Sequence, residues 1–463
     1  MMDRRQRNIA LLVAGTFFME ILDGTIVATA APSMAKSFGV ESSDIGVTIT
    51  AYLLTMAVLI PLSGWVAQRF GVRLVFVLAI AIFTVASLLC AISPNITVLV
   101  VMRVLQGVGA AMMVPVGRLS VLRGIPKTDV IRTIAFLTWP GLVAPVLAPA
   151  LGGFFTTYLS WHWIFLVNVP LGIVAFVVAL RLIPSVESAP PPPLDWWGLL
   201  LTCSGVAVLV SLADLLASSE QRWLPVTALS ISSVMLLGLA GWHLLRTRHP
   251  LLDLRIMQVR TFRIAHASGS LYRLAISAVP FLLPLMFQDA FGWSPIKAGT
   301  FVLFVFLGNV AIKPVTTRLL RVFGFRTVLI TSTSCAALSM ALAGILAPTT
   351  PEVLVALALT FGGVARSVGF TAYGTITFAD IDQDRLPAAN TLSATVQQVA
   401  GGFGVAVGAV ALRVGSAVTA APVTGAVAPY RFAFFVIAAL TLIPVIDAFR
   451  MDRAAGQSLQ PAR

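Results

Sequence analysis

Long apolar stretches, each close to the length that crosses a bilayer, recur along the whole chain. A transmembrane helix needs about 20 consecutive apolar residues, and charged, proline-rich or glycine-rich segments separate one stretch from the next. The pattern therefore predicts an all-α membrane protein with fourteen transmembrane helices. The expected spans are residues 9–31, 45–67, 74–93, 97–122, 132–157, 162–183, 196–217, 224–245, 264–289, 297–320, 326–347, 352–378, 390–417 and 430–449.

A short sequence repeat relates the two ends of the chain. Residues 68–76 read QRFGVRLVF after the second span, and residues 321–329 read RVFGFRTVL after the tenth. Both follow the second helix of a block of six, so the repeat predicts two related bundles separated by a pair of additional helices. We expect an N-terminal six-helix bundle over residues 1–183, a linker with two extra transmembrane helices over 184–263, and a C-terminal six-helix bundle over 264–463.

The composition favours a membrane protein, and the charge pattern orients it. Hydrophobic residues make up 58% of the chain and charged residues 11%, with a net charge of +13. Most lysines and arginines outside the spans fall in loops on the same side as the N-terminus, which is the pattern of cytoplasmic loops. We therefore expect a multi-pass protein of the inner (cytoplasmic) membrane with both termini in the cytoplasm, and no nucleic-acid partner.

No arrangement of reactive side chains predicts an enzyme. The four histidines are scattered, and the three cysteines lie inside apolar spans without the spacing of a metal site or a disulfide framework. The sequence also lacks a phosphate-binding loop of the G-x-x-x-x-G-K-[ST] type. We therefore expect no enzymatic activity, no metal, no cofactor, and energy from an ion gradient. A channel or a membrane sensor is the alternative from another class.

Five short motifs, in matching order and spans, resemble one known family. They lie in the first span, in the loop between spans 2 and 3, and in spans 4, 5 and 6. With this layout the chain resembles the fourteen-spanner drug:proton antiporters of the major facilitator superfamily. The motifs are LDGTIVATAAP (22–32), GWVAQRFGVR (64–73), RVLQGVGAA (103–111), APALGG (148–153) and WHWIFLVNVPLG (161–172).

The resemblance implies a major-facilitator fold and a function. We expect a secondary active efflux transporter that exports drugs or small organic compounds by alternating access. The proton gradient would drive it, and it would work as a monomer in the lipid bilayer. Three positions depart from the family pattern, because Gln68 replaces an acid, Ala148 replaces a glycine and Ala28 replaces an asparagine. The first departure weakens the case for an acid-based latch between helices.

Two of the motifs indicate moving parts. In the motif between spans 2 and 3, the glycine permits a tight turn between antiparallel helices. The arginines beside this glycine can bind helix C-terminal carbonyls or lipid phosphates. The resemblance implies a cytoplasmic gate here, and a basic turn that only orients the chain is the alternative. In span 5, prolines kink the helix and glycines allow close packing, so the alternatives are a hinge and a purely structural kink. The expected gate or hinge residues are Gly64, Arg69, Gly71, Arg73, Pro145, Pro149, Gly152 and Gly153.

Two acids one helical turn apart lie inside the first span. At a rise of about 1.5 Å per residue, Asp23 lies roughly 12 Å below the outer face and Arg103 of span 4 roughly 9 Å below it. We therefore expect a buried ion pair between them. Glu20 lies one turn deeper on the same face and has no assigned partner, which suits it to load and release a proton. Proton coupling is expected from these three residues, and a structural role for both acids is the alternative.

The second half of the chain places basic residues, and no acids, at depth. Arg273, Lys313 and Arg366 lie far from either surface, whereas Arg118 near the inner face is expected to snorkel. The deep basic residues either hold the fold through backbone carbonyls or bind an anionic group of the substrate. We favour substrate binding, and hence anionic or zwitterionic small molecules. Export of anionic metabolites such as carboxylates is the alternative to export of cationic drugs.

Overall fold

The described part of the chain folds almost entirely into helices. A computed structural model of the protein describes residues 4–40, 45–122, 130–184, 193–217, 223–420, 426–452 and 456. Its elements in chain order are α1 (Arg4–Phe38), α2 (Gly46–Leu59), η1 (Ile60–Leu62), α3 (Ser63–Phe70), α4 (Val72–Ala91), α5 (Ile96–Leu122), α6 (Val130–Tyr158), α7 (Trp163–Leu166), α8 (Asn168–Leu182), α9 (Trp196–Ala217), α10 (Trp223–Arg246), η3 (Leu254–Gln258), α11 (Arg260–Leu285), η4 (Met286–Ala290), α12 (Pro295–Ala311), α13 (Lys313–Ile345), α14 (Glu352–Ile376), η5 (Gln383–Arg385), α15 (Leu386–Thr419) and α16 (Ala428–Arg450).

Each predicted span coincides with one helix or with helical segments in series. Twelve helices in the described residues are long and apolar enough to cross a membrane, and Lys297–Ala311 forms a shorter apolar helix. The fifth predicted span is occupied by α6, which has 29 residues. The all-α fold class is therefore confirmed, and the chain is a multi-pass membrane protein. The side on which the termini lie stays a prediction.

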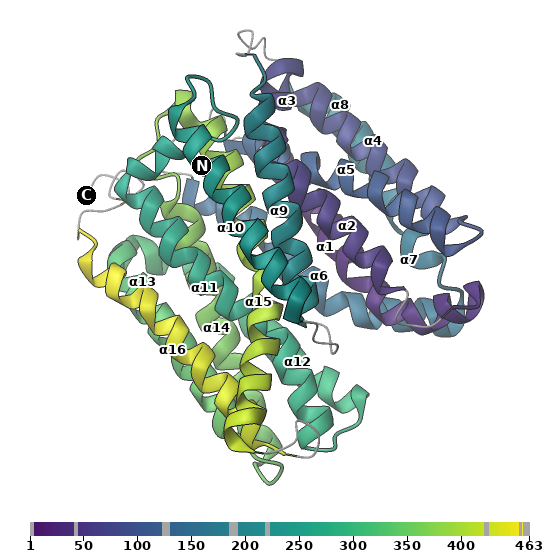
Figure 1. Cartoon of the computed structure of the whole chain (residues 1–463), viewed down its shortest axis with the longest axis vertical. Coiled ribbons are helices and arrows are strands. Elements are labelled where there is room, and N and C mark those ends of the chain that lie inside the picture. Colours follow the sequence, from purple (N-terminus) through teal and green to yellow (C-terminus); the bar gives the residue numbers. More distant parts are fainter. Residues whose placement is uncertain are drawn as a thin grey trace.

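The same helix pairs pack together in both halves of the molecule. In the N-terminal bundle (α1–α8), α1 packs against α6, α5 against α2 and α4, and α4 against α8. In the C-terminal bundle (α11–α16), α11 packs against α15, α14 against α12 and α13, and α13 against α16. The pairs correspond one to one between the two bundles (Figure 1), as in transporters built from related repeats. The residue boundaries predicted for the bundles and the linker stay a prediction.

A glycine turn follows the second membrane span of each bundle. Gly71 has φ 84° between α3 and α4, and Gly324 has φ 74° inside α13, where it divides that element into two helical segments. Glycine adopts a positive φ without the steric cost that a side chain brings. The turns therefore reverse the chain at the two positions where the sequence repeats.

The arginine two residues after each glycine turn caps the last helix of its own bundle. Arg73 Nη2 donates to Leu180 O in α8 at 2.7 Å. Arg326 Nη2 donates to Phe449 O in α16 at 2.8 Å. The carbonyls in the last turn of a helix have no intrahelical partner and carry partial negative charge. The repeated arginine thus has the same structural contact in both bundles.

The tenth predicted span is divided between two helices in the structure. The sequence predicts a single helix over residues 297–320, but α12 ends at Ala311 and α13 begins at Lys313. Pro314 follows in the first turn of α13, where its missing N–H leaves no helical bond unmade. An uninterrupted helix would place this proline in its interior and lose a hydrogen bond. The break at Ile312 therefore follows from the proline.

The two additional helices form a hairpin against the seam between the bundles. Helix α9 packs against α10 and also against α2 and α15, one helix from each bundle (Figure 1). Cys203 Sγ of α9 lies 3.0 Å from Val58 O of α2. Arg413 Nη1 of α15 donates to Leu216 O of α9 at 2.9 Å. The hairpin therefore touches both bundles through α9, while most apolar side chains of α10 are exposed for lipid contact.

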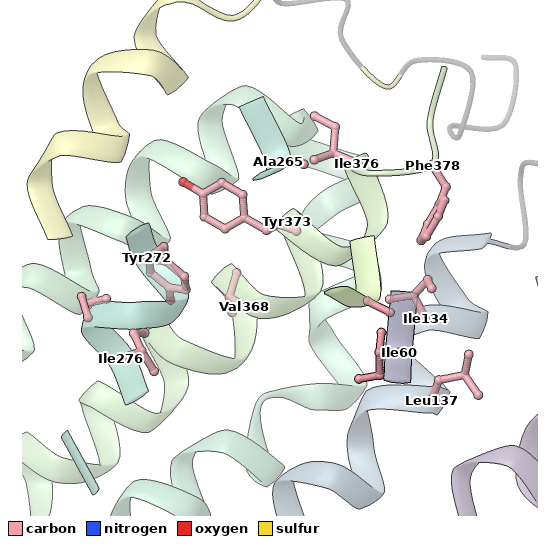
Figure 2. Close-up of a cluster of buried hydrophobic side chains, with 14 of the residues drawn as sticks. Ile60, Ile134, Leu137, Ala265, Tyr272, Ile276, Val368, Tyr373, Ile376 and Phe378 are labelled. Carbon is pink, nitrogen blue, oxygen red and sulfur yellow. The ribbon is translucent and has the colours of Figure 1, made fainter. Parts of the chain in front are cut away.

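The two bundles also contact each other directly, near the end that carries the chain termini. Asn390 Nδ2, at the start of α15, donates to Pro115 O of α5 at 2.8 Å. Ile134 of α6 lies close to Gly374, near the end of α14. Figure 2 shows Ile134 near Phe378 in a buried apolar cluster that includes residues of both bundles. These contacts join the two bundles at this end of the seam.

Candidate functional site

A polar network surrounds Asp23 inside the N-terminal bundle. Arg103 Nη1 of α5 donates to Asp23 Oδ2 in a short ion pair, and to Gln106 Oε1 at 2.7 Å. The second carboxylate oxygen, Asp23 Oδ1, accepts from Gln106 Nε2 at 2.9 Å and from Asn168 Nδ2 of α8 at 2.8 Å. Gln106 Nε2 also donates to Ser87 Oγ of α4 at 2.8 Å. The structure therefore brings Asp23 and Arg103 together, as their depths predict.

The guanidinium group of Arg103 is completely enclosed. Both Arg103 and Asp23 are 0% exposed. Arg103 Nε donates to Thr48 O at 3.2 Å, and the guanidinium carbon lies 4.2 Å from the centroid of the Tyr52 ring. A buried charge is stable only when it is paired and hydrogen-bonded, and the ring face adds a cation–π contact. The network therefore ties α1, α2, α4, α5 and α8 together around one ion pair.

Sequence reasoning missed the neutral members of this network. Gln106 follows Arg103 by three residues, so the two side chains share one face of α5. Asn168 lies inside the WHWIFLVNVPLG motif of span 6. Amide side chains inside membrane helices usually bond to neighbouring helices, which is the signal that could have found both.

Glu20 lies one turn from Asp23 but does not join its network. Glu20 is 9% exposed, and its Oε2 has no hydrogen-bond partner. The Tyr52 hydroxyl donates to the Glu20 backbone carbonyl oxygen at 3.4 Å. Arg118 of α5, which the sequence predicts to snorkel, is partly buried and carries the charge opposite to that of Glu20. Among the described residues no ion pair joins the two side chains, so the two acids of α1 have different surroundings.

Two of the predicted substrate-binding residues share one aromatic ring. The guanidinium carbons of Arg273 and Arg366 lie 4.7 and 5.5 Å from the centroid of the Phe370 ring. Arg273 Nη2 also donates to Gln397 Oε1 at 3.1 Å, in a cavity between α11, α14 and α15. Arg366 lines a separate, mostly apolar cavity inside the C-terminal bundle, where its Nε and Nη1 have no hydrogen-bond partner. The two positive charges are thus close together but belong to different cavities.

Lys313, the third basic residue of this set, lies at the start of α13. It is 8% exposed, and its Nζ donates to Thr371 Oγ1 of α14 at 2.8 Å. Thr371 in turn donates to Ser367 O at 3.0 Å. Lys313 lines neither the cavity of Arg273 nor that of Arg366. Among the described cavities, therefore, no single one collects all three basic residues.

The predicted gate residues lie where α3 meets α4 and the C-terminal bundle. A Cβ atom at Gly64 would lie 2.1 Å from Thr391 Oγ1 of α15, so the close approach of these helices depends on the glycine. Gly71 forms the turn with positive φ, and Arg73 caps α8. Arg69 is exposed at the end of α3. The gate motif therefore makes one contact across the seam and one within its own bundle.

The predicted hinge residues all lie on α6, in different surroundings. A Cβ atom at Gly152 would lie 1.9 Å from Thr29 Oγ1, so this glycine lets α6 pack tightly on α1. Gly153 has nothing within 4 Å of that position, and Pro145 is partly buried. The side chain of Pro149 lies outside the described residues. One of the two glycines is therefore required for packing.

Two related six-helix bundles, an added hairpin and deep charged residues define a class of membrane transporter. The family model described as Major Facilitator Superfamily matches residues 13–405 and 265–458 of the chain. The chain belongs to the major facilitator superfamily. It is therefore a secondary transporter and not an enzyme.

Curated relatives of the chain include proteins called MdtD, described by their names as candidate multidrug resistance proteins. The chain is 36% identical over 405 residues to MdtD of Serratia proteamaculans (strain 568), covering 86% of this chain and 83% of that protein. It is 35% identical over 454 residues to MdtD of Enterobacter sp. (strain 638), covering 97% and 95%. It is 38% identical over 407 residues to MdtD of Klebsiella pneumoniae (strain 342), covering 86% and 84%.

Solved structures of two other transporters share the fold. The human organic anion transporter MFSD10 (TETRAN) superimposes with a TM-score of 0.70 at 15% identity, covering 96% of this chain and 100% of that one. The proton:xylose symporter XylE bound to 6-bromo-6-deoxy-D-glucose gives a TM-score of 0.67 at 12% identity, covering 97% of each chain. At these identities the likeness concerns the fold alone.

Proposed function

We propose that the protein exports small organic compounds in exchange for protons, by alternating access, and that Glu20 takes up and releases the proton. The similarity to candidate multidrug resistance proteins supports export of drugs or related compounds. The proposed site of action is the inner membrane, with both termini in the cytoplasm. The proton gradient supplies the energy, and a monomer suffices.

The contrast between the two buried acids of α1 is the observation that carries this proposal. Both oxygens of Asp23 accept hydrogen bonds, and its charge is matched by Arg103. A proton on Asp23 would leave the charge of Arg103 uncompensated and disrupt the whole network. Oε2 of Glu20 is buried and has no partner, so a proton can bind there without breaking a hydrogen bond. We therefore assign proton exchange to Glu20, and positioning of the coupling helices to Asp23 and Arg103.

The basic residues of the C-terminal bundle are the proposed substrate contacts. Arg273 lines a polar cavity, and Arg366 has two buried donors without partners. Guanidinium groups recognise carboxylates with paired donors, which favours anionic or zwitterionic substrates. Lys313 is included because it is buried at the junction of α12 and α13. Export of anionic metabolites such as carboxylates is the second candidate function, and these same residues support it.

The proposed gate lies at the end of the seam that carries the chain termini. Gly64 and Thr391 bring α3 and α15 together there, and Asn390 bonds to α5. Alternating access requires these contacts to form in one state and break in the other. Arg73 keeps α4 attached to α8 within its own bundle, so the bundle can move as a unit.

Transport into everted membrane vesicles tests the proposal. A panel of acidic, zwitterionic and cationic fluorescent compounds is added outside, and accumulation is followed with and without a proton uncoupler. We expect at least one class to accumulate, and the uncoupler to abolish that accumulation. A channel would equilibrate its solute without accumulation, and a sensor would transport nothing.

Two variants identify the proton site within the same assay. Glu20→Gln should lose accumulation driven by the proton gradient and keep downhill exchange of the substrate. Glu352→Gln is the matched control, because Glu352 lies in an exposed ion pair with Lys297 at the outer end of α12. Full proton-driven accumulation in the Glu20 variant would show that another group carries the proton.

A further inference from the structure

Arg366 brings a permanent positive charge into the C-terminal bundle, and two of its donor atoms bond to nothing in the described part of the fold. Its Nε and Nη1 are buried and have no hydrogen-bond partner. A guanidinium group does not lose its proton in a protein, so the charge persists. Among the described residues, the ion pairs do not include Arg366. A charge inside a membrane is stable only with a partner of opposite sign, and no described side chain supplies one here.

The charged groups around Arg366 do not balance it. Arg273 lies against the same aromatic ring and is also positive. The face of that ring attracts a cation, but less strongly than a full negative charge does. Asp447 of α16 accepts a hydrogen bond from α11 at 2.6 Å, and Asp289 accepts one from α16 at 3.1 Å. Neither acid lines the cavity of Arg366. The positive charge therefore stays uncompensated by its described neighbours.

The cavity that Arg366 lines is small, and its described walls belong to one bundle. Residues of α11, α12, α13, α14 and α16 form it, and the other polar side chain among them is Ser339. The Ser339 hydroxyl donates to Ala336 O at 2.7 Å. The cavity encloses about 30 Å³. About 10–15 Å³ of such space holds one water molecule, so one or two groups of that size fit.

We propose that this cavity binds one small monovalent anion, of the size of chloride or bromide, as the counter-ion of Arg366. The volume admits a single small ion and excludes an organic acid. One negative charge matches one guanidinium group, whereas a divalent ion would leave a negative charge uncompensated inside the bundle. The inference goes beyond the proposed function, because the ion binds whether or not a substrate is transported.

The ion site is separate from the cavity proposed to receive the acidic group of a substrate. The Phe370 ring lines the cavity of Arg273 and does not line that of Arg366. An ion beside Arg366 therefore leaves the cavity of Arg273 free. An acidic substrate that reaches Arg366 itself has to displace the ion, so the two ligands compete at that residue.

Small residues on one face of α14 keep the cavity open. Ala358, Gly362 and Arg366 follow one another at intervals of four residues, so they share a face of the helix. All three line the cavity. A Cβ atom at Gly362 would lie 3.1 Å from Ser339 Oγ, which shows how close α13 is at this point. A leucine at position 358 would fill the space and leave the guanidinium group in place.

Equilibrium binding of radioactive chloride tests the inference on the purified protein in lipid nanodiscs. The protein is prepared in gluconate buffer, and bound chloride is measured by scintillation proximity over a series of concentrations. The wild type should bind chloride saturably, with one ion per chain. Bromide should compete for the site, whereas benzoate and sulfate should not.

Matched variants locate the ion. Arg366→Gln removes the charge and Ala358→Leu fills the cavity, and each should weaken chloride binding by about tenfold or more. Arg273→Gln removes a positive charge from the neighbouring cavity, so it should keep one ion per chain and weaken binding less than Arg366→Gln does. Arg181→Gln, at an exposed position of α8, should match the wild type.

Thermal unfolding is a second measurement, and it also shows whether each variant folds. In gluconate the wild type contains an uncompensated buried charge, so chloride should raise its melting temperature saturably. Arg366→Gln lacks this charge. It should melt in gluconate at or above the temperature of the wild type and should not respond to chloride. An arginine that only holds the helices together would instead give a loss of stability in both buffers.

Four results would overturn the inference. The first two are absence of saturable chloride binding by the wild type and unchanged binding by Arg366→Gln. The third is unchanged binding by a folded Ala358→Leu variant, which would place the ion outside the cavity. The fourth is competition by benzoate as strong as that by bromide, which would show that the cavity accepts an organic acid. None of these results depends on the vesicle assay, so failure here leaves the proposed export to be judged separately.

Discussion

Replacing Asp23 by asparagine should destabilise the N-terminal bundle far more than the loss of one hydrogen bond does. The change keeps the size of the side chain and removes its charge. Arg103, which is 0% exposed, is then left with an uncompensated positive charge. The new amide also offers one acceptor oxygen in place of two, although Arg103, Gln106 and Asn168 all donate to Asp23.

The magnitude follows from the burial of the pair. Removing one partner of a buried ion pair costs about 3–5 kcal/mol, whereas a hydrogen bond between membrane helices contributes about 0.6 kcal/mol on average. Ser87→Ala, which removes one neutral partner of Gln106, is therefore the matched control, with an expected loss of about 0.6 kcal/mol. Combining Asp23→Asn with Arg103→Gln should cost less than the sum of the two single changes, by about 0.5–3 kcal/mol.

The thiol of Cys90 can report when the network around Asp23 opens. Cys90 is 0% exposed, and its Sγ lies 3.7 Å from Gln106 Oε1. With the partly buried Cys203 and Cys335 replaced by alanine, a thiol-reactive dye labels Cys90 only when the bundle opens. Labelling followed through a denaturant titration in nanodiscs gives the free energy of unfolding of each variant.

Two results would refute this reasoning. The first is a loss of stability for Asp23→Asn that lies within about 0.5 kcal/mol of the loss for Ser87→Ala, since the charge would then contribute little beyond one hydrogen bond. The second is additivity in the double variant, because residues that interact directly are expected to show a coupling energy.

Three further predictions concern the proton site, the gate and the hinge. Glu20→Gln should abolish uncoupler-sensitive accumulation in everted vesicles, and intact accumulation would exclude Glu20 as the proton site. Gly64→Ala should impair transport because its Cβ would lie 2.1 Å from Thr391 Oγ1, and adding Thr391→Ala should restore it in the same assay; failure of this rescue would contradict the proposed contact. Gly152→Ala should lower the free energy of unfolding by about 1–3 kcal/mol through overpacking. Gly153→Ala, with open space around it, should change the free energy of unfolding by no more than about 0.5 kcal/mol. If the denaturant titration gives the same loss of stability for Gly152→Ala and Gly153→Ala, the packing argument is wrong.

The helices could be predicted from the sequence because the bilayer imposes their length. Apolar runs of about 20 residues can satisfy their backbone groups in lipid only as helices. The pairing of Asp23 with Arg103 was predictable for a related reason, since a fixed rise per residue places both side chains at similar depth. The division at Ile312 was missed, because hydropathy averages over Pro314 and the break leaves the apolar run uninterrupted.

Contacts between distant helices could not be predicted in this way. Depth along a helix does not specify which neighbour a side chain faces. Arg118 lies near the end of its span, yet it is partly buried in the folded bundle. Arg273 and Arg366 lie close to one ring but line different cavities. The position of a charge around its helix axis therefore depends on packing, which only the folded bundle specifies.

The sequence by itself determined that the chain crosses the membrane many times, that it contains two related blocks of helices, and that acids lie deep in the first span. These properties follow from local hydrophobicity and from repetition along the chain. The tertiary structure decided that Asp23 is fully bonded while Glu20 Oε2 is not, and that Gly64 meets Thr391 across the seam. These properties depend on residues far apart in sequence, because a buried charge or a close helix contact is defined by every neighbour around it.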